Sequence, residues 1–409
     1  MSHIVAELRH LPTWRLRVAI FLSFFPCAFL FPFGYPTREV ITLLAWIVAF
    51  PSLLTALSLL LLPLFLSNSY GYFAFNLFSL LATLGVCTEA SKQNGNGNAW
   101  DEFIGTIRLC IFSTIIIAVT QALDSTIWLS FFPDVGISEG RGAGFRTEPS
   151  LLAAPLAIYL SALVFRLKDA VGSRRYGILG EALAVIFAFL VLTRSLSVLI
   201  TVVCFAPVLG AGLRYALPVG MLSLGAAAAV FVGRLRGALS DASGSVLYLL
   251  TLAVGSWRSV PDILILTNFK EYLLPGRPSQ LRDHLNTLAM AWLPGFEWLD
   301  NTYSTFSACA STLGLLVTAG IFAIGAVLGW KHTRSIAGMR FTWLLLYIAS
   351  WFFFPKYEAC GWISLAMLVA VPNAQVETIP AKSRSFLARF FYAACQPARD
   401  ARLRIFGHL

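Results

Sequence analysis

Charged residues are scarce in this chain of 409 residues: they make up 12% of it, whereas apolar residues make up 58%. Soluble globular domains carry roughly 25% charged and 45–50% apolar residues, so this chain has too few charges to cover a water-facing surface. The shortage also excludes a disordered chain and a nucleic-acid-binding domain. The composition therefore predicts a single all-α, polytopic integral membrane domain over residues 1–409. The formal net charge of +10 fits this class, because membrane proteins concentrate basic residues on one side.

Several motifs of metal and cofactor chemistry are also missing. No two of the seven cysteines have C-x-x-C spacing, and the chain has no H-E-x-x-H and no P-loop. An Asp-x-Asp element, which would hold the metal of a nucleotide-sugar transferase, is absent as well. We therefore expect no metal, no cofactor and no nucleic-acid partner. The cysteines are interpreted as small buried hydrophobic residues.

A series of apolar runs approaches the length of about 20 residues that a membrane-spanning helix needs. The runs lie at residues 18–34, 40–66, 70–88, 105–131, 150–166, 177–193, 196–213, 215–233, 305–330, 341–354 and 359–372. The first run ends in Phe-Pro-Phe-Gly-Tyr-Pro without a small-residue cleavage site, so it is interpreted as a helix and not as a signal peptide. Because of Pro51 and Pro63, the stretch 40–88 can form two kinked helices or three short ones. The total is about ten to twelve spans.

Basic residues indicate how these spans are oriented. They gather at the N-terminus and in residues 166–175, 331–340 and 373–409. By the positive-inside rule these four places, and hence both termini, are cytoplasmic. The loop 132–149 and the long segment 234–303 then face outward, which requires an odd number of crossings within residues 40–88. The basic tail also fits an amphipathic helix lying on anionic lipid.

One outward motif combines glycines, arginines and a carboxylate: R-G-A-G-F-R-T-E-P-S, from Arg141 to Ser150. Its Pro-Ser end suits the first turn of the next helix, which places Glu148 near the positive end of that helix. The glycines allow backbone to approach a ligand closely. Arg141, Arg146 and Glu148 together can bind a phosphate and activate a hydroxyl. Alternatively, an arginine–glutamate pair pins the loop at the membrane surface.

Two further charges lie inside or between apolar runs. Arg194 separates the runs 177–193 and 196–213. A cation there is costly unless it is paired or faces a water-filled cavity, so Arg194 is interpreted either as an anion contact or as a side chain that reaches the headgroups. Glu181 lies near a helix end, and we expect it to be paired for structural reasons.

The long outward segment carries more arginine than outward segments normally do. It contains Arg258, Arg277, Arg282 and the imidazole of His284. This surplus suggests an anionic ligand, and arginine suits a diphosphate because its planar fork donates two hydrogen bonds. His284 can act as a general base near neutral pH, or it can be an ordinary structural histidine of a loop.

These motifs resemble the O-antigen polymerase and ligase superfamily, in particular the Wzy-like polymerases. The resemblance rests on R-x-x-G-F-x-x-E-P-S at Arg141 to Ser150 and on the junction Thr193-Arg194-Ser195. It continues with Asn301-Thr-Tyr-Ser and a glycine-rich span beyond it, and covers roughly residues 130–330.

The resemblance implies polymerisation of oligosaccharide repeat units carried on undecaprenyl diphosphate, at the periplasmic face of a bacterial inner membrane. Neither a metal nor a cofactor is implied, and the partners are the lipid-linked oligosaccharide, the bilayer, and a chain-length regulator and flippase of the same pathway. Glu148 or His284 would be the base. Binding of the diphosphate or glycan would fall to Arg194 and Arg258, with weaker candidates in Arg146, Arg277 and Arg282.

Three other functions remain open at this level. A ligase of the superfamily would transfer finished polymer to an acceptor, but the fuller histidine pattern of ligases is missing around His284. A transporter or lipid flippase would place broken helices at the bilayer midplane. A non-catalytic scaffold would leave the outward arginines without a ligand.

Overall fold

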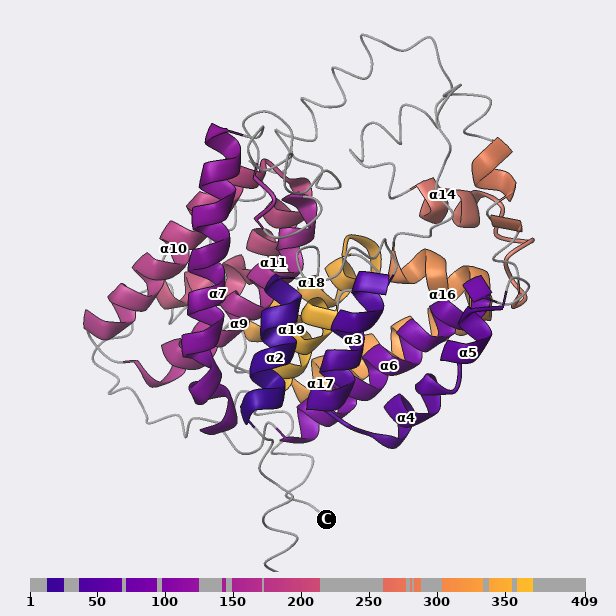
Figure 1. Ribbon diagram of the computed structural model, residues 1–409, viewed down its shortest axis with the longest axis horizontal. Helices are drawn as coiled ribbons and strands as arrows, with labels where there is room; N and C mark the ends of the chain where they lie inside the picture. Colours follow the sequence, from indigo (N-terminus) through magenta and orange to yellow (C-terminus); the bar gives the residue numbers. More distant parts are fainter. Residues whose placement is uncertain are drawn as a thin grey trace, which may run out of the picture. The chain divides into compact units, whose positions relative to one another are not determined.

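The computed structural model describes residues 13–25, 37–67, 71–93, 98–124, 142–144, 149–170, 173–213, 260–276, 280–281, 283–287, 304–333, 338–354 and 359–370. Every regular element named within these ranges is a helix (Figure 1), which confirms the predicted all-α class for this part of the chain. The chain divides into two units, residues 1–371 and 372–409, and all described residues belong to the first. The expected span 215–233 and the basic tail 373–409 lie outside the described residues.

The helices follow the predicted apolar runs closely. At α11 the observed and predicted ends coincide, whereas α10 starts before its apolar run because the polar residues Ser173–Tyr176 also adopt helical backbone. The elements in chain order are α2 (Thr13–Phe24), α3 (Thr37–Ala49), α4 (Leu53–Leu59), α5 (Leu62–Phe65), α6 (Gly71–Gln93), α7 (Asn98–Leu123), the 3-10 helix η1 (Pro149–Leu152), α9 (Ala153–Asp169), α10 (Ser173–Thr193), α11 (Leu196–Leu213), α14 (Val260–Thr267), α16 (Thr305–Leu313), α17 (Leu315–His332), α18 (Met339–Phe352) and α19 (Ala359–Ala370).

The stretch 40–88 forms three helical pieces: α3, the pair α4–α5, and α6. A capping box begins the middle piece, because the Ser52 hydroxyl accepts from the Thr55 amide and the Thr55 hydroxyl accepts from the Ser52 amide. Both α4 and α5 pack on α6.

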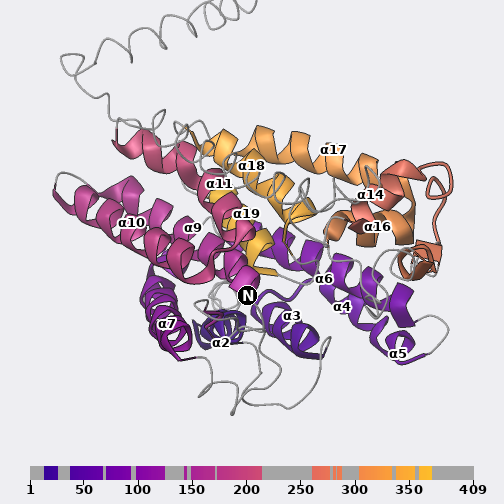
Figure 2. The same cartoon turned by 90° about the horizontal axis from the view of Figure 1, so that it is seen from above.

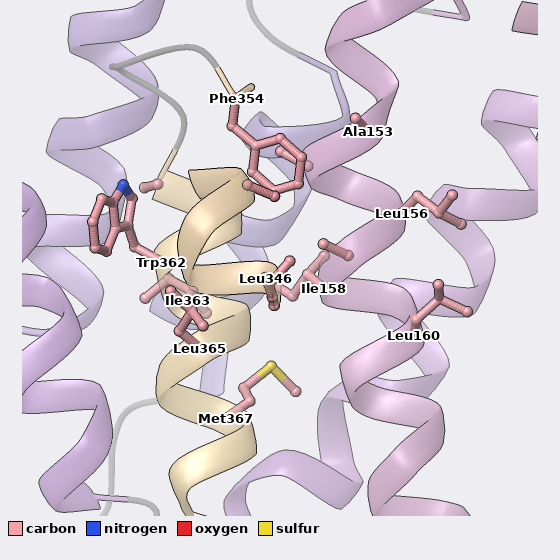
Figure 3. Close-up of a cluster of buried hydrophobic side chains, with 14 of the residues drawn as sticks. Ala153, Leu156, Ile158, Leu160, Leu346, Phe354, Trp362, Ile363, Leu365 and Met367 are labelled. Carbon is pink, nitrogen blue, oxygen red and sulfur yellow. The ribbon is translucent and has the colours of Figure 1, made fainter. Parts of the chain in front are cut away.

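Helices α9 and α19 supply much of the core and pack on each other. Every residue from 152 to 165 is buried, and so is every residue from 361 to 368. Figure 3 shows apolar side chains of this core, among them Ile158 of α9, Leu346 of α18 and Ile363 of α19. Cys110, Cys204 and Cys309 are fully buried, as expected of small hydrophobic residues, and Cys87 is half-buried; these four form no disulfide.

Other helices turn apolar side chains outward. Among the described helices, α6, α7, α10 and α17 are long and apolar enough to cross a bilayer. Of these, α7, α10 and α17 expose large apolar side chains, whereas α6 is mostly buried. Among these, α17 runs along one edge of the bundle (Figure 2) and leaves Leu316, Ile324 and Val327 more than 60% exposed. Such exposed apolar faces are what a lipid environment favours.

The expected single span 305–330 is instead two helices. The short helix α16 is buried at all but its last residue, and α17 follows it after a break at Gly314. Gly314 has φ +84° and ψ 154°, a conformation that only glycine adopts readily. A Cβ atom there would lie 2.7 Å from the Leu273 carbonyl oxygen, so the close packing of residues 273–275 also requires glycine.

Candidate functional site

The start of the glycine- and arginine-containing motif is buried between two helix ends. The Gly142 amide donates to the Leu192 carbonyl of α10 at 2.9 Å. On the other side, the amide group of Gln121 on α7 accepts from the Ala143 amide at 2.9 Å and donates to the Gly144 carbonyl at 2.7 Å. Residues 142–144 are therefore held through their own backbone groups, by the Leu192 carbonyl and the Gln121 side chain.

Glycine is needed at both ends of this buried segment. A Cβ atom on Gly142 would overlap the backbone of Ala118 on α7. Gly144 has φ +60°, and a Cβ atom there would lie 2.6 Å from the methyl group of Thr114. The two glycines thus let the segment lie directly against α7, whereas the close approach expected from the sequence was toward a ligand.

Arg194 occupies the junction between α10 and α11. Its backbone has φ +46°, and it is the non-glycine residue with positive φ among those described. Next to it, the buried Thr193 hydroxyl donates to the Phe189 carbonyl at 2.7 Å and accepts from the Ser195 amide at 3.3 Å. The side chain of Arg194 is exposed, and within the described residues it has neither a hydrogen bond nor an ion pair. The junction therefore presents a guanidinium group that is free to bind an anion.

The two motifs of the predicted site lie together. The hydrogen bond from Gly142 reaches Leu192, two residues before Arg194, and η1, which ends the first motif, packs on α9, α10 and α11. Five of the predicted site residues lie outside the described residues: Arg146, Glu148, Arg258, Arg277 and Arg282.

His284, the remaining predicted residue, lies in a small polar group that the sequence did not indicate. Its Nδ1 is 3.1 Å from the hydroxyl of the buried Tyr272, and its Nε2 is 3.7 Å from a carboxylate oxygen of Glu271. Gln280 donates to the same oxygen of Glu271 at 2.8 Å. Both ring nitrogens thus face groups that can exchange or hold a proton, while about a third of the side chain stays exposed.

A buried carboxyl group, Asp262, lies on the same segment, residues 234–303. It accepts a 2.5 Å hydrogen bond from the Ser304 hydroxyl, which caps α16 and also contacts the Ser307 hydroxyl at 2.8 Å. Burial raises the pKa of Asp262 to about 7, and the hydrogen bonds from Ser304 and Ser307 offset part of this rise. Asp262 was missed because its partners lie 42 residues away in sequence. A lone carboxylate beside the apolar run Ile-Leu-Ile-Leu was the available signal.

The outward segment is attached at the break between α16 and α17. The Tyr272 carbonyl accepts from the Leu315 amide at 2.7 Å, and the Gly276 amide donates to the Thr312 carbonyl at 3.0 Å. These bonds satisfy backbone groups that the break at Gly314 frees. The two polar groups are thus attached to the two ends of α16: Asp262 at its start through Ser304, and Tyr272, the partner of His284, at the break that follows it. Among the described residues, no hydrogen bond or ion pair joins either group to Arg194.

Comparisons with family models, curated proteins and solved structures found no match for this chain.

Proposed function

We propose that this chain polymerises oligosaccharide repeat units carried on undecaprenyl diphosphate, at the periplasmic face of a bacterial inner membrane. The observation that carries the proposal is the contact between the two motifs of the resemblance. Buried residues 142–144 bind the end of α10 through Leu192, next to an exposed and unpaired Arg194. An exposed arginine beside close-packed backbone suits a diphosphate.

The proposed reaction needs neither a metal nor a nucleotide, because diphosphate is already a good leaving group. An acceptor sugar hydroxyl forms a bond to the anomeric carbon of the donor, and the bond from that carbon to the diphosphate oxygen breaks. The diphosphate leaves with the electron pair, and Arg194 stabilises its growing negative charge. The hydroxyl proton passes to a base. Arg258 is proposed as a second contact to the diphosphate.

His284 is the better-supported candidate for the base. Its ring lies between the Tyr272 hydroxyl and the Glu271 carboxylate, and these two contacts orient the ring. Glu148 is the other candidate, from its place in the motif next to η1.

The membrane arrangement follows from charge and helix number. With α3, α4–α5 and α6 each counted as one crossing, an inside N-terminus brings the end of α7 and the loop 132–149 to the periplasm. The basic connection between α9 and α10 then returns to the cytoplasm, in agreement with the positive-inside rule. The segment 234–303 is periplasmic in this arrangement, and the C-terminus is cytoplasmic.

Deletion of the gene in its host, followed by sizing of the glycans on undecaprenyl diphosphate, tests the proposal. We expect single repeat units to accumulate on the outer leaflet, and Arg194→Ala to reproduce this result. Arg17→Ala, which removes an exposed arginine of α2, is the matched control and should leave polymer length unchanged. Full-length polymer stranded on the lipid would instead identify a ligase, and unchanged lipid-linked glycans would refute the whole group of functions.

A flippase or transporter is the second candidate, and one observation favours it. The helix pair α16–α17 is broken at Gly314, and the buried Asp262 lies at the start of its first half. Broken helices that end at polar sites are typical of transporters. In the same experiment, this function predicts single repeat units trapped on the inner leaflet.

A further inference from the structure

The helices α7, α9 and α10 are neighbours (Figure 2). They share a cluster of charged side chains. The Glu181 carboxylate of α10 is 2.7 Å from Arg108 Nε of α7 and 3.5 Å from a terminal nitrogen of Arg166 on α9. The Tyr159 hydroxyl of α9 donates to the same carboxylate at 3.1 Å. Glu181 is thus paired, as expected from the sequence, and both of its oxygens are used.

This cluster carries a surplus of positive charge. Two guanidinium groups share one carboxylate, and α10 begins next to them with the exposed Arg174 and Arg175. Arg108 approaches Glu181 through Nε at 2.7 Å, and 41% of its side chain is exposed, so part of the guanidinium group is open to an outside anion.

The side chains around Arg108 are apolar and point away from the helix bundle. On α7, the next residue, Leu109, is 70% exposed and Phe112 is 41% exposed. On α10, Leu183 and Phe187 are 49% and 69% exposed. Arg108 is the fifth residue of the apolar stretch Ile104–Leu123, which at about 1.5 Å per residue places it about 6 Å inside one end. Arginine at that depth reaches the headgroup level.

We propose that an anionic phospholipid of the cytoplasmic leaflet binds between α7 and α10. The phosphate of this lipid contacts the exposed guanidinium group of Arg108. Arg174 and Arg175 add electrostatic attraction. The acyl chains lie on the exposed apolar side chains of the two helices. The apolar flanks favour a lipid over a soluble anion, and basic sites between helices on the cytoplasmic side suit anionic headgroups. The inference rests on the proposed membrane orientation but not on glycosyl transfer.

The test measures thermal unfolding of the full chain in phosphatidylcholine nanodiscs with increasing fractions of phosphatidylglycerol. A ligand that binds only the folded state raises the midpoint of unfolding. We expect Arg108→Gln to lower the apparent affinity for phosphatidylglycerol about tenfold, which is the effect of losing one hydrogen bond to a charged group. The variant should therefore need more phosphatidylglycerol for the same rise in the midpoint of unfolding. The matched control is Arg340→Gln on α18, whose side chain donates to the Thr333 carbonyl away from the cluster; its response should equal that of the wild type.

Glu181→Gln gives the decisive comparison, because it frees both arginines. We expect it to strengthen the phosphatidylglycerol response, whereas a carboxylate with a structural role alone would only lower stability in every lipid. This variant decides the matter even if Arg108→Gln fails to fold. An equal response in all variants would overturn the proposal, and so would the same stabilisation by inorganic phosphate in phosphatidylcholine alone. Because glycan polymerisation is not measured, failure here leaves the proposed function untouched.

Discussion

At the scale of single residues, Arg194 stands out because its backbone conformation favours glycine. A non-glycine residue with positive φ costs about 1 kcal/mol or more, and such strain persists where the side chain has a use. Arg194→Gly should therefore raise the stability of the protein by up to about 1 kcal/mol and still abolish chain lengthening. Thermal unfolding and glycan sizing on the same variant measure both effects. An Arg194→Gly protein that makes normal polymer would contradict the proposed diphosphate contact.

Asp262 predicts a pH dependence of stability. Its pKa is about 7 in the folded protein and 3.8 as a free side chain, so the folded state holds the proton more tightly. Stability is then greatest below pH 3.8, falls as pH rises toward 7, and changes no further above it. Where this fall is steepest, the free energy of unfolding decreases by about 1.4 kcal/mol per pH unit.

Asp262→Asn removes this titration while its amide oxygen still accepts from Ser304. Melting curves between pH 5 and pH 8, referenced to the pKa of about 7, should show a smaller loss of stability for the variant than for the wild type. Parallel curves for the two proteins would show that Asp262 is not buried as a proton-binding group.

The contrast between His284 and Asp262 shows what sequence can reveal about single residues. Arg194 and His284 could be selected because a cation between apolar runs, or a lone outward imidazole, is unusual for its own neighbourhood. Asp262 could not, since what distinguishes it is burial against Ser304. The partners of His284, Tyr272 and Glu271, are also set by the folding of the outward segment.

At the scale of helices, Gly314 separates a buried half-helix from an exposed one. Gly314→Ala would place a methyl group 2.7 Å from the Leu273 carbonyl at φ +84°, so we expect a loss of about 2 kcal/mol or more. Gly320→Ala on the same helix is the matched control, because no atom lies within 4 Å of its added Cβ. That change should be neutral or stabilise the protein by up to about 1 kcal/mol. Equal melting temperatures for the two variants would argue against the break.

Hydropathy could locate helices but not this break. The run 196–213 became α11 with unchanged ends, because apolar length and the flanking Arg194 both mark where it starts. The run 305–330 is more polar before Gly314, where α16 contains four Ser or Thr residues, but the backbone angle that breaks the helix leaves no trace in hydropathy. The break depends on bonds to the outward segment, from Leu315 to Tyr272 and from Gly276 to Thr312, which only the folded chain brings together.

At the scale of the whole molecule, the exposed apolar faces and the basic connections must agree on one orientation. The faces of α7, α10 and α17 that carry exposed apolar side chains have no other helix against them in the described part of the chain. The composition predicted such faces, since so few charges cannot cover them. Composition alone could not show how residues 40–88 divide, because the division depends on the Ser52–Thr55 capping box and on packing against α6.

The orientation can be tested with an epitope tag inserted in the full chain, either within residues 132–138 or within residues 170–172. The short connection between α9 and α10 is flanked by basic residues, so we expect its tag to be hidden from antibody on intact spheroplasts and exposed after lysis. The tag within residues 132–138 should be accessible before lysis. Two crossings instead of three within residues 40–88, with the N-terminus inside, would reverse both results and place the Arg194 junction on the cytoplasmic side. Repeat units presented on the outer leaflet could then not reach it, so this outcome would also exclude the proposed polymerase.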